Sequence, residues 1–169
     1  MGQTNIDGIK TAIKAIFDTA NTTTGSPIDI SAGLNTRLSR VFKVNPARLP
    51  IQASLFPYLT IYATTKDPIE QITIGHKGNQ ASAMRKATLN LDIFGCVFEP
   101  LVPDINEDQG VENIERLMEN VEEVLRSNPT MGGTVAWAMP TRCQYEDIPY
   151  DEGSSLRAGI LELECTIHY

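Results

Sequence analysis

The sequence predicts an α+β fold: a mainly antiparallel sheet with two helices packed on one face, plus a long hairpin and an extended connector. Residues 4–20 and 109–126 carry apolar side chains at helical spacing. Several other stretches alternate apolar and polar residues, which is the period of a half-buried strand. Because most of these strands have no helix between them, antiparallel pairing is favoured, with both helices on one side.

The size and composition of the chain indicate one globular domain over residues 1–169. Hydrophobic residues make up 41% of the sequence and charged residues 21%, as in ordinary globular proteins. No stretch approaches the roughly 20 apolar residues that span a bilayer, and no secretory signal pattern opens the chain, so no membrane partner is expected. Cys96, Cys143 and Cys165 are widely spaced, and we expect buried free thiols, as in a reducing cytoplasm.

The charge is divided unevenly along the chain. Residues 1–90 hold ten basic and five acidic side chains, whereas residues 91–169 hold four basic and sixteen acidic ones, and the net charge is −7. This division suits a head-to-tail contact between copies of the chain, although an acidic surface that serves only solubility explains the counts equally well. The residues that we assign to a subunit contact are Arg37, Arg40, Lys43, Arg48, Lys77, Arg85, Lys86, Glu112, Glu115 and Glu119.

An amphipathic helix over residues 4–20 opens the chain, with Thr4 or Asn5 as its cap. The Thr-Thr-Thr-Gly-Ser-Pro run that follows breaks helix and strand alike, so residues 21–33 are expected to be irregular. The apolar stripe of the helix consists of Ile6, Ile9, Ile13, Ile16 and Phe17.

A basic connector covers residues 34–57. Pro46, Pro50 and Pro57 forbid a long regular element there, so we expect an extended segment. Residues 58–64 alternate tyrosine and threonine with apolar residues, which predicts the first central strand.

Residues 71–74 and 85–98 predict the two arms of a long hairpin. The second arm is expected to be either covered on both faces or bulged at Gly95, because its apolar side changes along its length. The loop over residues 75–84 has few apolar anchors, so we expect it to be mobile in a free subunit and ordered against a neighbour. One side of the second arm carries Leu89, Leu91 and Ile93, and the other carries Phe94, Cys96 and Phe98.

The helix over residues 109–126 has the clearest pattern in the chain, with most of its glutamates off the apolar stripe. Asn128 and Pro129 end this helix, and Gly132 and Gly133 turn the chain back. Such a stripe is expected to pack on a face of the sheet, since burying each large apolar side chain contributes about 1.5–3 kcal/mol.

The C-terminal part predicts two strands. Residues 134–146 form the first of them, with an interruption at Pro140, and residues 149–155 form a loop. Residues 156–169 form the final strand, whose period of two predicts one buried and one wet face. Its apolar positions are Leu161, Leu163, Cys165, Ile167 and Tyr169, and its polar positions are Glu162, Glu164, Thr166 and His168.

Catalytic, metal and cofactor sites are not indicated. His76 and His168 are the two histidines of the chain, one in a loop rich in glycine and one on the wet side of the last strand, and both fit surface residues. The glutamates of residues 109–126 lack a Glu-x-x-His pattern, and residues 75–78 lack the ending of a phosphate loop. We therefore expect no cofactor and no metal.

Specific DNA recognition is also not indicated. An acidic chain repels duplex phosphates except near its basic stretches, residues 34–48 and 77–86. Tyr58 and Tyr62 share one face of a predicted strand, where packing across strands is a more frequent role than stacking on bases.

The order of these parts resembles the tail terminator (tail completion) proteins of tailed bacteriophages. The likeness covers nearly the whole chain. It consists of the first helix, the arginine-bearing connector, the strand at residues 56–62, the hairpin, the helix ending in Asn-Pro, the Gly132-Gly133 turn and the terminal strand closing on residues 167–169.

The resemblance implies a structural virion protein, assembled in the host cytoplasm, without an active site. Such a protein forms a hexameric ring that caps the tail tube, ends its polymerisation and docks the head-side connector or neck protein. DNA would pass through an acidic lumen without specific binding. One alternative is another ring-forming part, either a head-tail connector or a tail tube subunit. Another is a small hydrolase, which would require His76 and His168 to converge beside a pocket.

Overall fold

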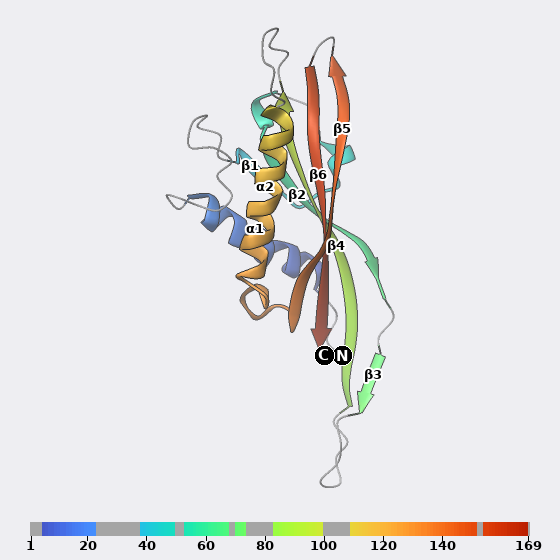
Figure 1. The fold of residues 1–169 in the computed structure, drawn as a ribbon. Helices are drawn as coiled ribbons and strands as arrows, with labels where there is room; N and C mark the ends of the chain where they lie inside the picture. Colours follow the sequence, from blue (N-terminus) through green and yellow to red (C-terminus); the bar gives the residue numbers. More distant parts are fainter. Residues whose placement is uncertain are drawn as a thin grey trace.

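In the described part of the chain, the protein forms a six-stranded sheet with two helices packed on one face (Figure 1). This computed structural model describes residues 5–22, 38–49, 53–67, 70–73, 83–99, 109–151 and 154–168. The helices are α1 (Ile6–Thr22) and α2 (Gln109–Arg126), and the strands are β1 (Arg40–Phe42), β2 (Tyr58–Lys66), β3 (Glu70–Thr73), β4 (Ala83–Glu99), β5 (Trp137–Asp151) and β6 (Ser154–His168).

The sheet is mainly antiparallel, as predicted. Its strand order is β1-β2-β4-β6-β5, and β3 pairs with the end of β4 that β2 leaves free. Among the described strands, only the neighbours β1 and β2 run parallel. The α+β prediction is therefore confirmed, and β1 and β5 lie at the two ends of the strand order (Figure 1).

Helix α1 begins and ends two residues later than the pattern predicted. Asn5 caps it, since its Oδ1 accepts a hydrogen bond from the backbone N–H of Gly8 at 2.8 Å. Ile9, Ile13 and Phe17 are buried, so the predicted apolar stripe does face the core. Helix α1 contacts β1 and β2 through this stripe and lies over that end of the sheet.

Helix α2 has the predicted bounds and packs over β4, β6 and β5. Its buried residues are Ile114, Leu117, Met118, Val121, Val124 and Leu125. They meet the buried side of the final strand, where Leu161, Leu163, Cys165 and Ile167 alternate with more exposed polar residues, as predicted. At about 1.5–3 kcal/mol for each large apolar side chain, this contact is a main source of stability.

Strand β4 is covered on both faces near one end, which was one of the two predicted outcomes. Leu91 and Ile93 face the helices, while Phe94 and Cys96 belong to a second apolar cluster on the other face. The predicted bulge at Gly95 is wrong, because its neighbours stay in regular register with both adjacent strands.

The connector supplies the cover for this second face. It contains β1 and two short 3₁₀ turns, Pro46–Arg48 and Ala53–Leu55, so the prediction of a simply extended segment is wrong in detail. Within the described residues of the connector, 38–49 and 53–57, no element exceeds three residues, in agreement with the prolines. Its partly buried residues Phe42, Leu49, Leu55 and Phe56 pack against the second cluster.

Strand β5 is longer at its far end than predicted, and the loop expected at residues 149–155 is wrong. The strand starts at Trp137 and continues to Asp151, and β6 begins at Ser154. Register shifts occur next to Pro140 and Pro149. Both prolines are tolerated because β5 is an edge strand, where a missing N–H need not interrupt the ladder.

The predicted hairpin is confirmed by the pairing of β3 with β4, from Glu70 opposite Lys86 to Thr73 opposite Ala83. Residues 74–82, which include most of the loop predicted to be mobile, lie outside the described residues. So do residues 23–37 and Tyr169.

Two paired glycines let α2 approach the sheet closely. Gly95 lies opposite Gly159 on the neighbouring strand, and Met118 of α2 lies over both. A Cβ at Gly159 would be 2.4 Å from the Met118 Cγ, and one at Gly95 would be 2.7 Å from its Sδ.

Gly159→Ala is expected to lower the free energy of unfolding by about 1–3 kcal/mol, because the added methyl group overpacks the contact with Met118. Met118→Ala alone is expected to cost about 2–5 kcal/mol through the cavity that it leaves. In the double variant, the loss of unfolding free energy should be smaller than the sum of the two single losses, because the smaller side chain at position 118 makes room for the added methyl group. Urea denaturation of the three variants measures this coupling, and strictly additive losses would contradict it.

Candidate subunit interface

The predicted acidic contact residues lie together on α2. Glu112 accepts a hydrogen bond from Arg116 at 2.6 Å within the helix. Glu115 and Glu119 are exposed and have no basic partner within salt-bridge distance among the described residues. They face Tyr145 of β5, where desolvation, Cys143 and then these two carboxylates raise the pKa of the phenol. The negative potential of α2 therefore extends to the edge of the sheet.

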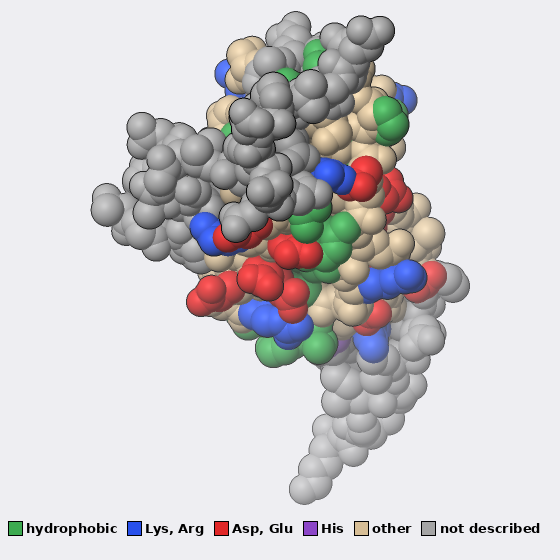
Figure 2. All heavy atoms as spheres, turned by 45° about the horizontal axis from the view of Figure 1, so that its top comes forward, with side chains coloured by type: hydrophobic (Ala, Val, Ile, Leu, Met, Phe, Trp, Pro, Cys, Tyr) green, Lys and Arg blue, Asp and Glu red, His purple; other side chains and the backbone are tan. Residues whose placement is uncertain are grey.

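Strand β5 carries exposed apolar side chains that the sequence pattern did not reveal. All four large hydrophobic side chains that are exposed in the described part of the chain belong to it: Trp137, Met139, Tyr145 and Tyr150, which are 40–53% exposed. On the face in Figure 2, acidic side chains gather in one area beside hydrophobic side chains. These side chains lie on both faces of the strand, because Met139 pairs with Glu164 on the open face and Tyr145 pairs with Gly159 on the helix face. Of the four, Tyr145 is the one beside the acidic residues of α2.

The basic contact residues of the connector lie at the other end of the sheet. Lys10, Lys43 and Arg48 line a hollow of about 600 Å³ beside Tyr62 and Ala63 of β2. Lys43 is held by Asp7, at 3.1 Å between Nζ and Oδ1. Within the described residues, neither Lys10 nor Arg48 has a carboxylate within salt-bridge distance. Two positive charges of this hollow are therefore available to a partner.

The remaining predicted contact residues are dispersed or not described. Arg40 lies near the same edge as the hollow, with its guanidinium carbon 5.9 Å from the centre of the Phe42 ring. Lys86 is on β4 opposite His168, away from the hollow. Arg37 and Lys77 lie outside the described residues, and the side chain of Arg85 is also not described.

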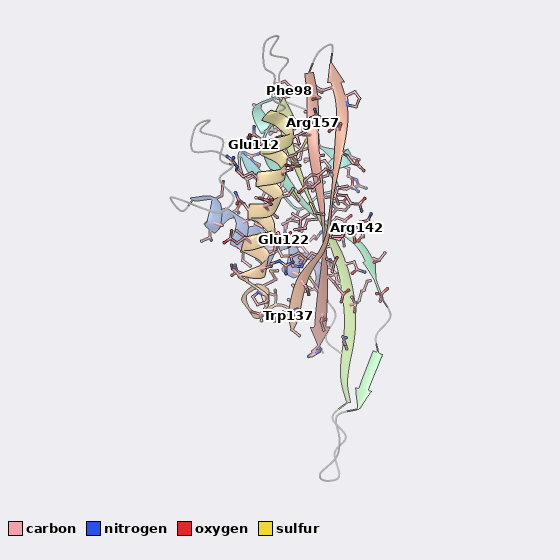
Figure 3. The ribbon with its side chains drawn as sticks, in the orientation of Figure 1. Phe98, Glu112, Glu122, Trp137, Arg142 and Arg157 are labelled. Atoms are coloured by element: carbon pink, nitrogen blue, oxygen red, sulfur yellow. The ribbon has the colours of Figure 1, made fainter. Side chains whose placement is uncertain are left out.

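The structure thus places the predicted acidic contact residues near the β5 edge of the sheet and several of the basic ones near the β2 edge. It does not bring the two sets together within one chain. The reason is the strand order, which places the β1–β2 edge and the β5 edge farthest apart. Glu112 and Glu122 both project from α2, while Arg142 lies on the opposite side of the sheet (Figure 3).

A polar row crosses that opposite side, which the helices do not cover. Tyr62, Asp92, Glu162 and Arg142 are successive partners on β2, β4, β6 and β5. Desolvation and the neighbouring charge of Glu162 raise the pKa of Asp92, and a hydrogen bond from Tyr62 opposes the rise. Two carboxylates directly opposite each other repel, so the row is held by the fold against an electrostatic cost.

The described residues show no group arranged for nucleophilic catalysis. Burial raises the pKa of Cys96 and of Cys165 to about 12, which leaves almost no thiolate at neutral pH. His168 is exposed at the end of β6, and His76 lies outside the described residues. No cluster of three or more possible metal ligands occurs in the described part of the chain.

Comparisons with protein-family models and with curated proteins gave no match for this chain. Within the described ranges, neither helix has the length and apolar character that crossing a membrane requires.

Partial burial of Asp92, with a smaller contribution from the charge of Glu162, makes stability depend on pH. Because the pKa of Asp92 is raised by folding, the folded chain binds this proton more tightly than the unfolded chain does, and stability falls as pH rises through the raised value. Asp92→Asn is therefore expected to raise the melting temperature at pH 7, with the gain vanishing near the ordinary carboxyl pKa of about 4.

Thermal unfolding followed by circular dichroism between pH 4 and pH 8 measures this difference. Glu164→Gln is the matched control, because Glu164 is on the same side of β6 but lies opposite Asn90 and Met139. An equal gain in both variants would show that total charge, not the local environment of Asp92, limits stability.

Proposed function

We propose that this chain is a ring-forming structural protein of a phage tail, of the tail terminator type. In this role it caps the tail tube, ends tube polymerisation and offers a docking surface to the head-side connector or neck protein. The observation that carries the proposal is that Glu115 and Glu119 lie at one end of the sheet and Lys10 and Arg48 at the other, without salt-bridge partners among the described residues. The order of elements, which resembles that of tail terminator proteins, supports the same class.

Opposite charges at opposite edges favour a heterologous contact. Glu115 and Glu119 of one copy can approach Lys10 and Arg48 of the next, and the resulting pair still has one free acidic edge and one free basic edge. A contact of this type closes into a ring when its rotation divides a full turn. The resemblance to tail terminators suggests six copies.

The face that the helices leave open suits the wall of a DNA channel. Asp92, Glu162 and Glu164 lie on it, and Arg142 is the basic member of the polar row. A predominantly acidic wall repels phosphates, so DNA would slide past it without binding. In the proposed ring this face lines the lumen, and the helices face outward.

The purified chain is expected to form closed rings at low salt and to dissociate as salt rises, because exposed ion pairs weaken once the Debye length falls from about 10 Å at 0.1 M to about 3 Å at 1 M. Light scattering after size exclusion measures the mass at each salt concentration, and negative-stain microscopy shows the ring. A monomer at all protein and salt concentrations would overturn the proposal.

Capping is tested separately from ring formation. Deleting the gene from the phage that encodes this chain is expected to yield tail tubes of irregular and excessive length, and supplying the protein is expected to restore uniform tubes. Electron microscopy of tube lengths is the measurement. Tubes of normal length that fail to join heads would instead favour a connector role, and absence of tubes would favour a tube subunit.

A further inference from the structure

Strand β5 is an edge strand with an outer side that can pair with a further strand. It lies at the end of the strand order and pairs, among the described residues, only with β6. An edge strand exposes a row of unpaired N–H and C=O groups, which natural proteins usually protect. Here Tyr145 is 48% exposed on the same strand, beside two carboxylates of α2.

Two prolines limit the part of β5 that can accept a further strand. Pro140 and Pro149 lack an N–H, and the register shifts next to each of them. Residues 141–148 between them retain every backbone donor. At about 3.4 Å per residue this segment is roughly 27 Å long, and Tyr145 lies near its centre.

A second free edge exists at the opposite end of the sheet. Strand β1 pairs only with residues 58–60 of β2. Beyond Thr60, no described strand pairs with the outer side of β2, and residues 63–65 are exposed. This part of β2 adjoins the basic hollow, which includes Tyr62 and Ala63.

The two free edges are compatible in direction. Strand β2 is antiparallel to β4, β4 to β6 and β6 to β5, so β2 and β5 run in opposite directions within one subunit. A copy added beside the first in the same orientation therefore places its β2 antiparallel to the β5 of the first. Antiparallel ladders are slightly the more stable kind.

The charges agree with the same arrangement. In a continued sheet, the helices of both copies stay on one face, so α2 of the first copy comes next to α1 of the second. Glu115 and Glu119 then approach Lys10 and Arg48 from the partner's basic hollow. Pairing β5 with β5 of another copy would instead set the acidic helices against each other.

We propose that residues 141–148 of β5 pair with the free outer edge of β2, at residues 61–65, in the next copy of this chain. The sheet then continues from subunit to subunit around the ring, with Tyr145 covered by the neighbour. This inference rests on the self-association proposed above and names the contact that produces it.

Hydrogen–deuterium exchange of the wild-type protein tests the pairing directly, with assembled protein at low salt compared with dissociated protein at high salt. Outward amides in residues 141–148 and 61–65 are expected to be protected only in the assembly. If rings form while either segment remains unprotected, the proposed strand pairing is overturned, but the proposal of a ring is not. A chain that never associates would overturn both proposals.

Charge reversal distinguishes the proposed contact from β5–β5 pairing. The pair Glu115→Lys and Glu119→Lys makes both edges basic, and the pair Lys10→Glu and Arg48→Glu makes both acidic. Each double variant alone is expected to remain dissociated, and an equimolar mixture is expected to form rings. Assembly of the second variant alone would overturn the inference, because that variant leaves β5 and α2 unchanged.

Tyr145→Ala tests the apolar centre of the contact. Loss of a tyrosine at the centre of an interface is expected to weaken association about tenfold or more. Tyr150→Ala is the matched control, because Tyr150 lies beyond Pro149 and contacts Phe98 of its own chain, with 5.8 Å between ring centres. Circular dichroism verifies that both variants fold, and equal weakening by both would contradict the assigned segment.

Discussion

The packing of α2 on β4 and β6 is the contact on which the rest of the structure depends. Gly95 and Gly159 face each other across these strands and admit Met118 close to the backbone. The close approach buries most of the apolar stripe of α2, from Ile114 to Leu125, and fixes where its acidic side chains point. Because α2 packs over β4, β6 and β5, its residues Glu115 and Glu119 lie close to Tyr145 of the edge strand β5.

The two faces of the sheet divide the molecule into different roles. One face is buried under both helices along most of its length. The other is covered only where the connector packs on Phe94 and Cys96, and it becomes polar toward Asp92 and Glu162. Strand β4 is therefore buried on both faces near Phe94 and Cys96, whereas nearer its N-terminal end only the helix face is buried. Its hydrogen bonding to β6 is continuous through both parts.

Much of the fold could be predicted from the sequence, because periodicity records burial. Helix α2 and the alternation of Leu161, Leu163 and Cys165 match the structure for this reason. The extent of β5 could not be predicted, because a proline such as Pro149 usually indicates a loop. A strand can continue through it at the edge of a sheet, and the sequence does not show which strand lies at the edge. The exposure of Trp137 could not be predicted either, because alternation shows which residues share a side of a strand but not which side is covered.

Charge counts predicted the separation of acids and bases but not its geometry. The two halves of the sequence could have folded so that Glu115 and Glu119 met the connector within one chain. The strand order prevents this, because two strands, β4 and β6, lie between the β2 edge and the β5 edge. An attraction that cannot be satisfied inside a subunit remains available between subunits. The prolines of β5 add a limit, since residues 141–148, between Pro140 and Pro149, are the longest part of the strand with a complete set of donors. Indiscriminate pairing along the whole edge is thereby disfavoured.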